Sequence, residues 1–100
     1  MSNPLTIGLI QHACSDDVVA NWRESEQGIR DAAAQGAELV ILPELHASVY
    51  FCQTEDTSLC DLAEPIPGPG TERLGRLAEE LGVVIVGSLF ERRAAGLFHN

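Results

Sequence analysis

The chain has 100 residues, of which 45% are hydrophobic and 21% charged, and its formal net charge is −9. This composition indicates a single small globular domain rather than a disordered chain. The excess of acid, with six arginines and no lysine, argues against a nucleic-acid partner, because phosphate contacts require clustered cations.

The start of the chain and its apolar runs bear on location. Residues Met1–Pro4 are not a positive segment followed by an apolar one, so no secretion signal is predicted. No apolar run approaches the roughly 18 residues that cross a bilayer, so no membrane partner is expected. We therefore expect a cytoplasmic protein. The lack of a CxxC pair among Cys14, Cys52 and Cys60 favours reduced thiols over disulfides or a zinc site.

The first predicted unit is a strand followed by a helix. Leu5–Ile10 is short, apolar and β-branched, which is typical of a buried strand. Residues 15–17, Ser-Asp-Asp, supply capping oxygens and negative charge for a helix over Val18–Gln35, which Gly36 ends. The inward stripe of this helix is expected to hold Trp22, Glu26, Ile29 and Ala33.

A second strand is predicted over Glu38–Leu42, and Pro43 ends it by removing a backbone donor. The residues Glu44–Thr57 have no regular pattern, and Ser58–Ala63 could form a helical turn. Glu64–Gly70 is rich in proline and glycine, which is typical of a stiff connector. A connection of this length is more often functional than idle.

Thr71 is expected to cap a second helix, which Gly82 ends. Val83–Leu89 predicts a third buried strand, Glu91–Gly96 a hairpin turn and Leu97–Asn100 the start of a fourth strand. The apolar stripe of the second helix is Leu74, Leu77, Ala78 and Leu81.

These elements predict an α/β fold in which strand–helix–strand units pair their strands in parallel. Strands that are apolar on both faces indicate a sheet covered on both sides. A hairpin that stops four residues into its second arm would leave an unpaired edge. We therefore expect residues 1–100 to be the N-terminal part of a single larger domain.

One carboxylate is notable for its position. In open α/β sheets, ligands gather beyond the carboxyl ends of the strands, and Glu44 follows the second predicted strand by two residues. A carboxylate held there behind the rigid Pro43 can accept a proton near neutral pH. The pattern alone leaves open whether Glu44 does so, pairs with an arginine or caps a turn.

Several short motifs follow one another along almost the whole chain. They are Gln11 after the first strand, Gln35–Val40, Ile41–Leu45, Glu64–Pro69, Val84–Glu91 and His99–Asn100. In this order they resemble the nitrilase superfamily of carbon–nitrogen hydrolases, in which a strand ends in Pro-Glu.

The segment Tyr50-Phe51-Cys52-Gln53 is similar to the N-carbamoylputrescine amidase branch of that superfamily. His46 stands where that branch usually has an aromatic residue, and Ala47–Val49 also departs from its pattern. The resemblance implies hydrolysis of N-carbamoylputrescine to putrescine, CO2 and ammonia in polyamine biosynthesis, with Tyr50 as a substrate contact. β-Ureidopropionase-like and ω-amidase-like activities are the alternatives.

The resemblance also implies an α-β-β-α sandwich and a homo-oligomer. The family site uses a Glu, a Lys and a Cys and proceeds through a thioester acyl-enzyme, with no metal or organic cofactor. Only the Glu maps onto this chain, at Glu44, because the family Lys and nucleophilic Cys lie further downstream. We therefore expect these 100 residues to be inactive on their own.

Other assignments stay open at this point. His12 and Cys14 lie two residues apart near the end of the first strand and could form a Cys–His pair. His46 could face either the site or solvent. Cys52 is expected to shape a pocket and Cys60 to be structural. The competing class is a small non-enzymatic α/β binding domain, complete at 100 residues.

Overall fold

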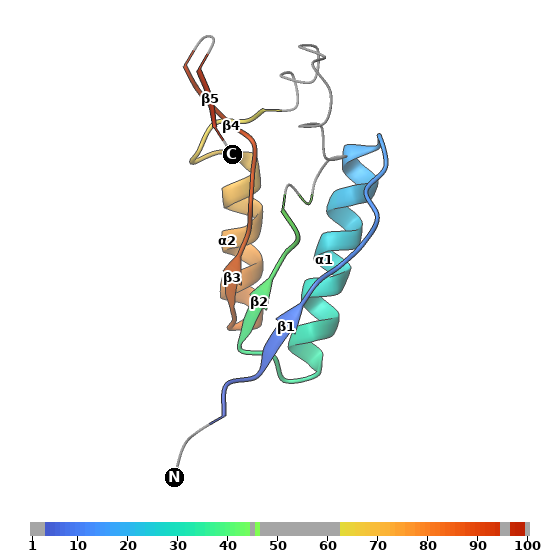
Figure 1. Cartoon of the computed structure of the whole chain (residues 1–100). Helices are drawn as coiled ribbons and strands as arrows, with labels where there is room; N and C mark the ends of the chain where they lie inside the picture. Colours follow the sequence, from blue (N-terminus) through green and yellow to red (C-terminus); the bar gives the residue numbers. More distant parts are fainter. Residues whose placement is uncertain (1–3, 45, 47–62, 95–96, 100) are drawn as a thin grey trace.

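The structure is a computed structural model and describes residues 4–44, 46, 63–94 and 97–99. Its elements are, in chain order, β1 (Ile7–Leu9), α1 (Val18–Ala34), β2 (Leu39–Ile41), α2 (Pro69–Leu81), β3 (Val84–Val86), β4 (Glu91–Ala94) and β5 (Leu97–His99) (Figure 1). The predicted α/β class and the alternation of strand and helix are confirmed. None of the described helices is long and apolar enough to cross a membrane.

The first three strands form one parallel sheet in the order β1-β2-β3. Ile7 pairs with Leu39, and Leu39 pairs with Val84, so the strands run in the same direction. All three strands are shorter than the sequence predicts, because each predicted apolar run includes residues on either side of those in the paired register. The central position of β2 places its carboxyl end between those of its neighbours.

The boundaries of α1 follow the predicted capping. Asp17 is the N-cap, and its side chain accepts hydrogen bonds from the backbone N–H groups of Val19 and Ala20 at 3.0 and 3.2 Å. The helix ends at Ala34, and Gly36 follows with a φ of 96°, a backbone conformation that L side chains rarely adopt.

The start of α2 differs from the prediction. The helix begins at Pro69, with Gly68 rather than Thr71 as its N-cap. Thr71 lies in the first turn, where its hydroxyl accepts a hydrogen bond from the Gly68 N–H at 2.7 Å. Proline suits the first helical position because its missing N–H would have no partner there. Gly82 ends the helix as predicted, with a φ of 66°.

The predicted strand from Leu97 is confirmed as β5, whereas the turn predicted over Glu91–Gly96 is too long, since Glu91–Ala94 is the strand β4 and pairs antiparallel with β5. Backbone bonds to Glu64 support this strand. The Glu64 N–H donates to the Phe90 carbonyl at 2.8 Å, and the Arg92 N–H donates to the Glu64 carbonyl at 2.7 Å. The Glu-Arg-Arg-Ala sequence does not predict this strand, because it lacks alternating apolar residues. Backbone pairing stabilises the strand instead.

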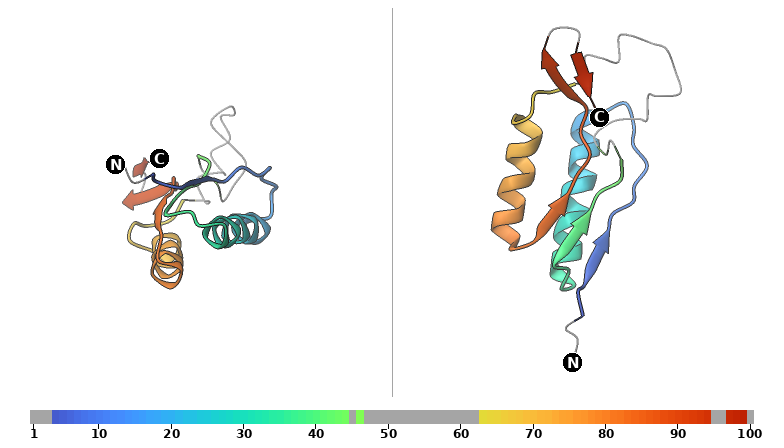
Figure 2. Two further views of the ribbon diagram at one scale, coloured as in Figure 1. Left: turned by 90° about the horizontal axis from the view of Figure 1, so that it is seen from below. Right: turned by 60° about the vertical axis from the view of Figure 1, so that its left-hand side comes forward.

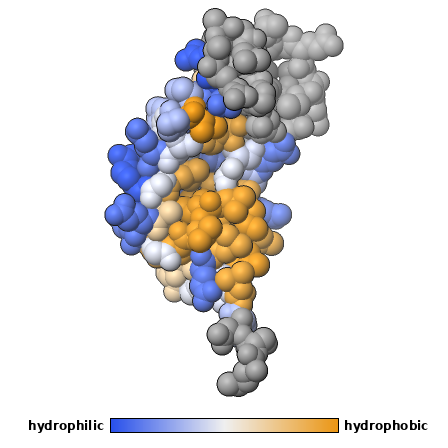
Figure 3. Space-filling model, turned by 90° about the vertical axis from the view of Figure 1, so that its left-hand side faces the viewer, coloured by the Kyte–Doolittle hydropathy of each residue, from blue (hydrophilic) through white to orange (hydrophobic). Residues whose placement is uncertain are grey.

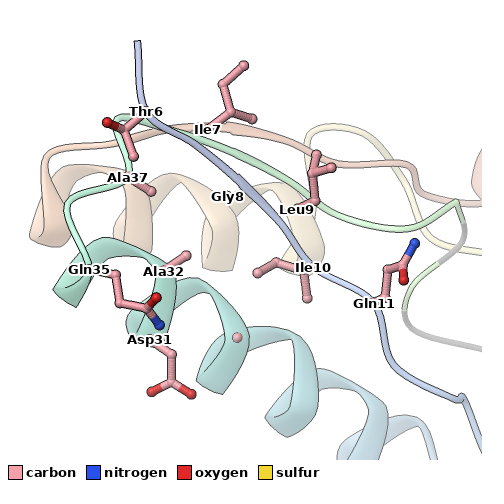
Figure 4. A pocket seen from close by; sticks show the side chains of 11 residues that line it. Thr6, Ile7, Gly8, Leu9, Ile10, Gln11, Asp31, Ala32, Gln35 and Ala37 are labelled. Carbon is pink, nitrogen blue, oxygen red and sulfur yellow. The ribbon is translucent and has the colours of Figure 1, made fainter. Parts of the chain in front are cut away.

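Both helices pack on the same face of the parallel sheet (Figure 2). A Cβ atom on Gly8 would touch Ala32 of α1, so the face of β1 that includes Gly8 and Ile10 looks towards the helices. Figure 4 shows Ile10 pointing towards α1, and Ile7 and Leu9 pointing away from it. The buried core between helices and sheet consists of Ile29, Ala37, Val40, Leu42, Leu77 and Val83.

The opposite face of the sheet is apolar and exposed. Leu9, Val84 and Val86 have exposed fractions of 71%, 62% and 50%, and Leu5 and Ile7 lie on the same strand face as Leu9. Apolar side chains gather in one broad area of the surface in Figure 3. The expectation that the sheet is covered on both sides is therefore not met by the described residues, whose helices cover one face only.

Candidate functional site

The residues after β2 carry the candidate carboxylate. The Leu42 N–H donates to the Val86 carbonyl at 2.9 Å, and the Leu42 side chain is buried in the core. Pro43 follows, and Glu44 then lies exposed just past the carboxyl end of the sheet. This is the location that the sequence predicts for it, whereas its role as a base stays a prediction.

His46, two residues further on, is fully buried, with no exposed surface. Its ring meets Trp22 of α1 edge to face, with centroids 4.7 Å apart and an interplanar angle of 87°. Its Nδ1 lies 2.8 Å from the hydroxyl oxygen of Ser25, which is also fully buried. His46 therefore faces α1 and the interior, and of the two alternatives from the sequence the solvent-facing one is wrong.

The same serine reaches a second histidine. The Ser25 hydroxyl lies 2.9 Å from Nε2 of His12, and Nδ1 of His12 lies 3.9 Å from Sγ of Cys14. The Cys14 thiol in turn donates to the backbone carbonyl of His46 at 3.2 Å. The suspected proximity of His12 and Cys14 is confirmed, and Ser25 and His46 join them.

The electrostatic surroundings keep His46 neutral. Burial, the neighbouring His12 and the cation of Arg73 together lower the pKa of His46 from 6.5 to about 4. Arg73 belongs to α2 and lies over the Trp22 ring, 4.8 Å from its centroid. Its guanidinium also pairs with Glu26 at 3.4 Å. Because this carboxylate belongs to α1, the pair connects the two helices beside the histidine.

A second carboxylate was not singled out from the sequence. Glu64 accepts a hydrogen bond from the backbone N–H of Gly70 at 2.9 Å, at the start of α2. Burial raises the pKa of Glu64, and this hydrogen bond acts in the opposite direction. The Glu-Pro-Ile-Pro-Gly-Pro-Gly pattern predicted a stiff connector, and it gave no sign that the side chain folds back onto the helix.

A groove of about 440 Å³ lies elsewhere, along the edge of β1 between residues 6–11 and α1 (Figure 4). Neither Glu44 nor His46 lines it, and among the described residues that do, Asp31 is the only ionisable one. It therefore lacks the paired acid and base groups that hydrolytic chemistry requires.

The other residues named from the sequence have different outcomes. Tyr50, Cys52 and Cys60 lie outside the described residues. The part of the chain that the structure describes holds no group of three or more His, Cys, Asp or Glu side chains that could bind a metal. Ser25 was missed as a functional group because the predicted inward stripe of α1 had Glu26 and Ala33, whereas the buried residues of this helix are Asn21, Trp22, Ser25 and Ile29. A buried serine must find a hydrogen-bond partner.

The chain is similar in sequence to known proteins of one family. The sequence profile of the carbon–nitrogen hydrolase family matches residues 6–100. An N-carbamoylputrescine amidase from Solanum lycopersicum is 41% identical over 88 residues, which are 87% of this chain and 29% of that protein. One from Arabidopsis thaliana is 39% identical with the same coverage.

A solved structure agrees with the sequence matches. The crystal structure of a carbon–nitrogen hydrolase from Helicobacter pylori G27 superposes with a TM-score of 0.88 at 33% identity. The match covers 96% of this chain and 33% of that one. The chain thus spans about a third of the length of the relatives it matches.

Proposed function

The chain belongs to the carbon–nitrogen hydrolase family, and we therefore propose that the protein containing it hydrolyses the C–N bond of a small carbamoyl amine, with Glu44 as the general base. The observation that supports this role is the position of Glu44. It lies three residues after the end of β2, at the edge of the parallel sheet where ligands of α/β proteins gather.

The proposed chemistry combines Glu44 with a lysine and a cysteine from residues beyond Asn100. A free thiol has a pKa of about 8.5, so few thiolates exist at neutral pH. Glu44 accepts the thiol proton as the sulfur attacks the carbamoyl carbon, and the lysine ammonium stabilises the oxyanion that develops. Glu44 passes this proton to the leaving nitrogen, so that ammonia departs and the cysteine is left as an S-thiocarbamate, the carbamoyl form of the thioester acyl-enzyme. Glu44 then activates the water molecule that cleaves it.

The proposed substrate is N-carbamoylputrescine. Its hydrolysis consumes one water and yields ammonia and a carbamate, which decomposes to putrescine and CO2. Two observations support this choice: the 39–41% identity to proteins with this activity and the Tyr50–Gln53 segment. The net charge of −9 is compatible with a cationic substrate. Tyr50 is the residue of this chain that we propose to contact it.

The apolar outer face of the sheet supports a larger domain. An isolated α/β binding domain would need to cover this face itself, because contiguous apolar surface of this kind is seldom left in water. We propose that the rest of the same domain covers it as the second half of an α-β-β-α sandwich, and that the whole protein is a homo-oligomer.

The test is turnover by the intact protein on a panel of carbamoyl amines, carbamoyl amino acids and ω-amides, which measures kcat/KM for each class. We expect N-carbamoylputrescine to be preferred. Preference for a carbamoyl amino acid or an ω-amide would replace the substrate assignment without changing the family. Glu44→Gln should abolish turnover while the fold is retained, and persistent turnover would remove Glu44 from the mechanism.

A further inference from the structure

Glu44 lies between two residues that are firmly attached to the core. On one side, Leu42 is bonded to Val86 and its side chain is buried. On the other, His46 is held at three points: its ring nitrogen contacts Ser25, its ring packs on Trp22 and its carbonyl accepts the Cys14 thiol. Only one residue separates Glu44 from each anchor, so the path of its backbone depends on both.

The hydrogen bonds around His46 form a closed ring whose direction is fixed at one point. A backbone carbonyl can only accept, so the Cys14 thiol must donate to His46 at 3.2 Å. The sulfur is then left to accept from the Nδ1–H of His12, at 3.9 Å. With that proton on Nδ1, the neutral His12 accepts at Nε2 from the Ser25 hydroxyl, at 2.9 Å.

The last bond closes the ring and fixes the second tautomer. Because the Ser25 hydroxyl donates to His12, its oxygen accepts from the Nδ1–H of His46 at 2.8 Å. A neutral His46 with its proton on Nδ1 carries none on Nε2. This accounts for Nε2 being buried without a hydrogen-bond partner among the described residues: an unpaired acceptor is left there rather than a buried N–H donor.

We propose that His46 is a positioning residue for Glu44, and that His12, Ser25 and Cys14 hold it in place through this ring with both imidazoles neutral and protonated on Nδ1. The proposal rests on the proposed function of Glu44. The lowered pKa of His46 supports the neutral form. A phenylalanine at this position could pack on Trp22 but could not bond to Ser25, so the side-chain hydrogen bond depends on histidine.

The first test reads the tautomers directly and does not depend on activity. Nitrogen NMR of the intact protein, labelled with ¹⁵N-histidine, distinguishes imidazoles protonated on Nδ1 from those protonated on Nε2. His12→Gln and His46→Phe variants assign the two signals. We expect both residues in the Nδ1–H form at pH 7. A proton on Nε2 of either imidazole, or a cationic His46 at pH 7, would contradict the proposed ring of hydrogen bonds.

The second test asks whether the ring positions Glu44. Cys14→Ala removes the donor to the His46 carbonyl, whereas Cys14→Ser keeps one. Ser25→Ala cuts the link between the two imidazoles. We expect Cys14→Ala and Ser25→Ala to lower kcat about tenfold or more with KM within about twofold, since small displacements of a catalytic group are costly. Cys14→Ser should recover most of the loss. Glu24→Gln, at an exposed position next to Ser25 on α1, is the control.

The outcomes separate the two proposals. Equal kcat for Cys14→Ala and Cys14→Ser, or wild-type kcat for Ser25→Ala, would show that the ring does not position Glu44, even if Glu44→Gln is inactive. Turnover that survives Glu44→Gln would instead overturn the proposed function, whatever the tautomers are. Urea unfolding of each variant shows whether it is folded. If a variant does not fold, the tautomers measured on the unaltered protein still test the hydrogen-bond ring.

Discussion

Arg73 of α2 lies over the ring of Trp22 of α1, 4.8 Å from its centroid, while the same ring meets His46 edge to face. One aromatic side chain thus contacts a cation from the other helix and a neutral imidazole from the segment after β2. The cation influences the histidine as well, because a nearby positive charge disfavours a second one.

The charge of Arg73 can be removed without emptying the core. We expect Arg73→Gln to raise the pKa of His46, because one of the groups that disfavour the imidazolium is lost. It should lower the free energy of unfolding by only about 1 kcal/mol, since cation–π contacts at partly exposed sites are worth that much. NMR titration and urea unfolding measure the two effects. Arg23→Gln, at an exposed position of α1, is the control and should change neither. An unchanged pKa of His46 in Arg73→Gln would contradict the electrostatic effect of Arg73.

His46 should also make stability depend on pH. Its pKa is 6.5 when unfolded and about 4 when folded, so between these values the unfolded chain binds a proton that the folded chain does not. The contribution of His46 to the free energy of unfolding is therefore fully present above pH 6.5 and decreases as the pH is lowered. It stops changing near pH 4, after a total loss of about 3 kcal/mol.

The measurement for this prediction is urea unfolding of the intact protein between pH 7 and pH 4.5, with His46→Phe as the comparison. The variant should be less stable at pH 7, because the bond to Ser25 is lost, but its stability should fall less steeply with acid. Parallel curves for the two proteins would show that His46 does not carry this dependence.

Gly70 leaves room for the side chain of Glu64. A Cβ atom at position 70 would meet the Glu64 carboxylate, which would have to move and give up its hydrogen bond from the Gly70 N–H, so Gly70→Ala should cost about 1 kcal/mol. In a Glu64→Ala background the same change should cost little. Urea unfolding of the two single variants and the double variant gives the coupling energy, which we expect to be at least about 1 kcal/mol.

Gly75 on the same helix is the matched control, because a Cβ atom there would meet nothing within 4 Å. Gly75→Ala should raise stability by about 1 kcal/mol through helix propensity alone. Additive effects of the Glu64 and Gly70 substitutions would rule out the collision.

The apolar outer face of the sheet can be tested with two valines of similar exposure. Val86 is 50% exposed on β3 and Val19 is 60% exposed on α1. If the rest of the domain covers the sheet, Val86→Asp should destabilise the intact protein by about 3 kcal/mol or more, since it buries a polar group without a partner. Val19→Asp should be nearly neutral. Equal tolerance of both in urea unfolding would mean that this face stays in water.

The sequence predicted the parallel sheet and both helices because their signals are local. Asp17 and Gly36 define the ends of α1 through capping and backbone conformation, which depend on a few neighbouring residues. The strand β4 was predicted as a turn because its stability comes from backbone bonds to Glu64, which is distant in the chain. The start of α2 was misplaced because Thr71 can serve in the first turn as readily as at the cap.

The candidate site was predictable in a similar, partial way. The location of Glu44 follows from the end of β2, since the carboxyl edge of a parallel sheet is where side chains from several strands meet. The bonds of His46 do not follow from any local pattern, because His12, Ser25 and His46 come from three separate segments that only the folded sheet brings together.

The segment 47–62 joins two firmly attached ends. Before it, His46 is held by α1 and by Cys14; after it, Glu64 is bonded through its backbone to β4 and through its carboxylate to α2. These attachments are made by described residues on either side of the segment. It follows that the folded scaffold itself sets the distance between the two ends of this segment.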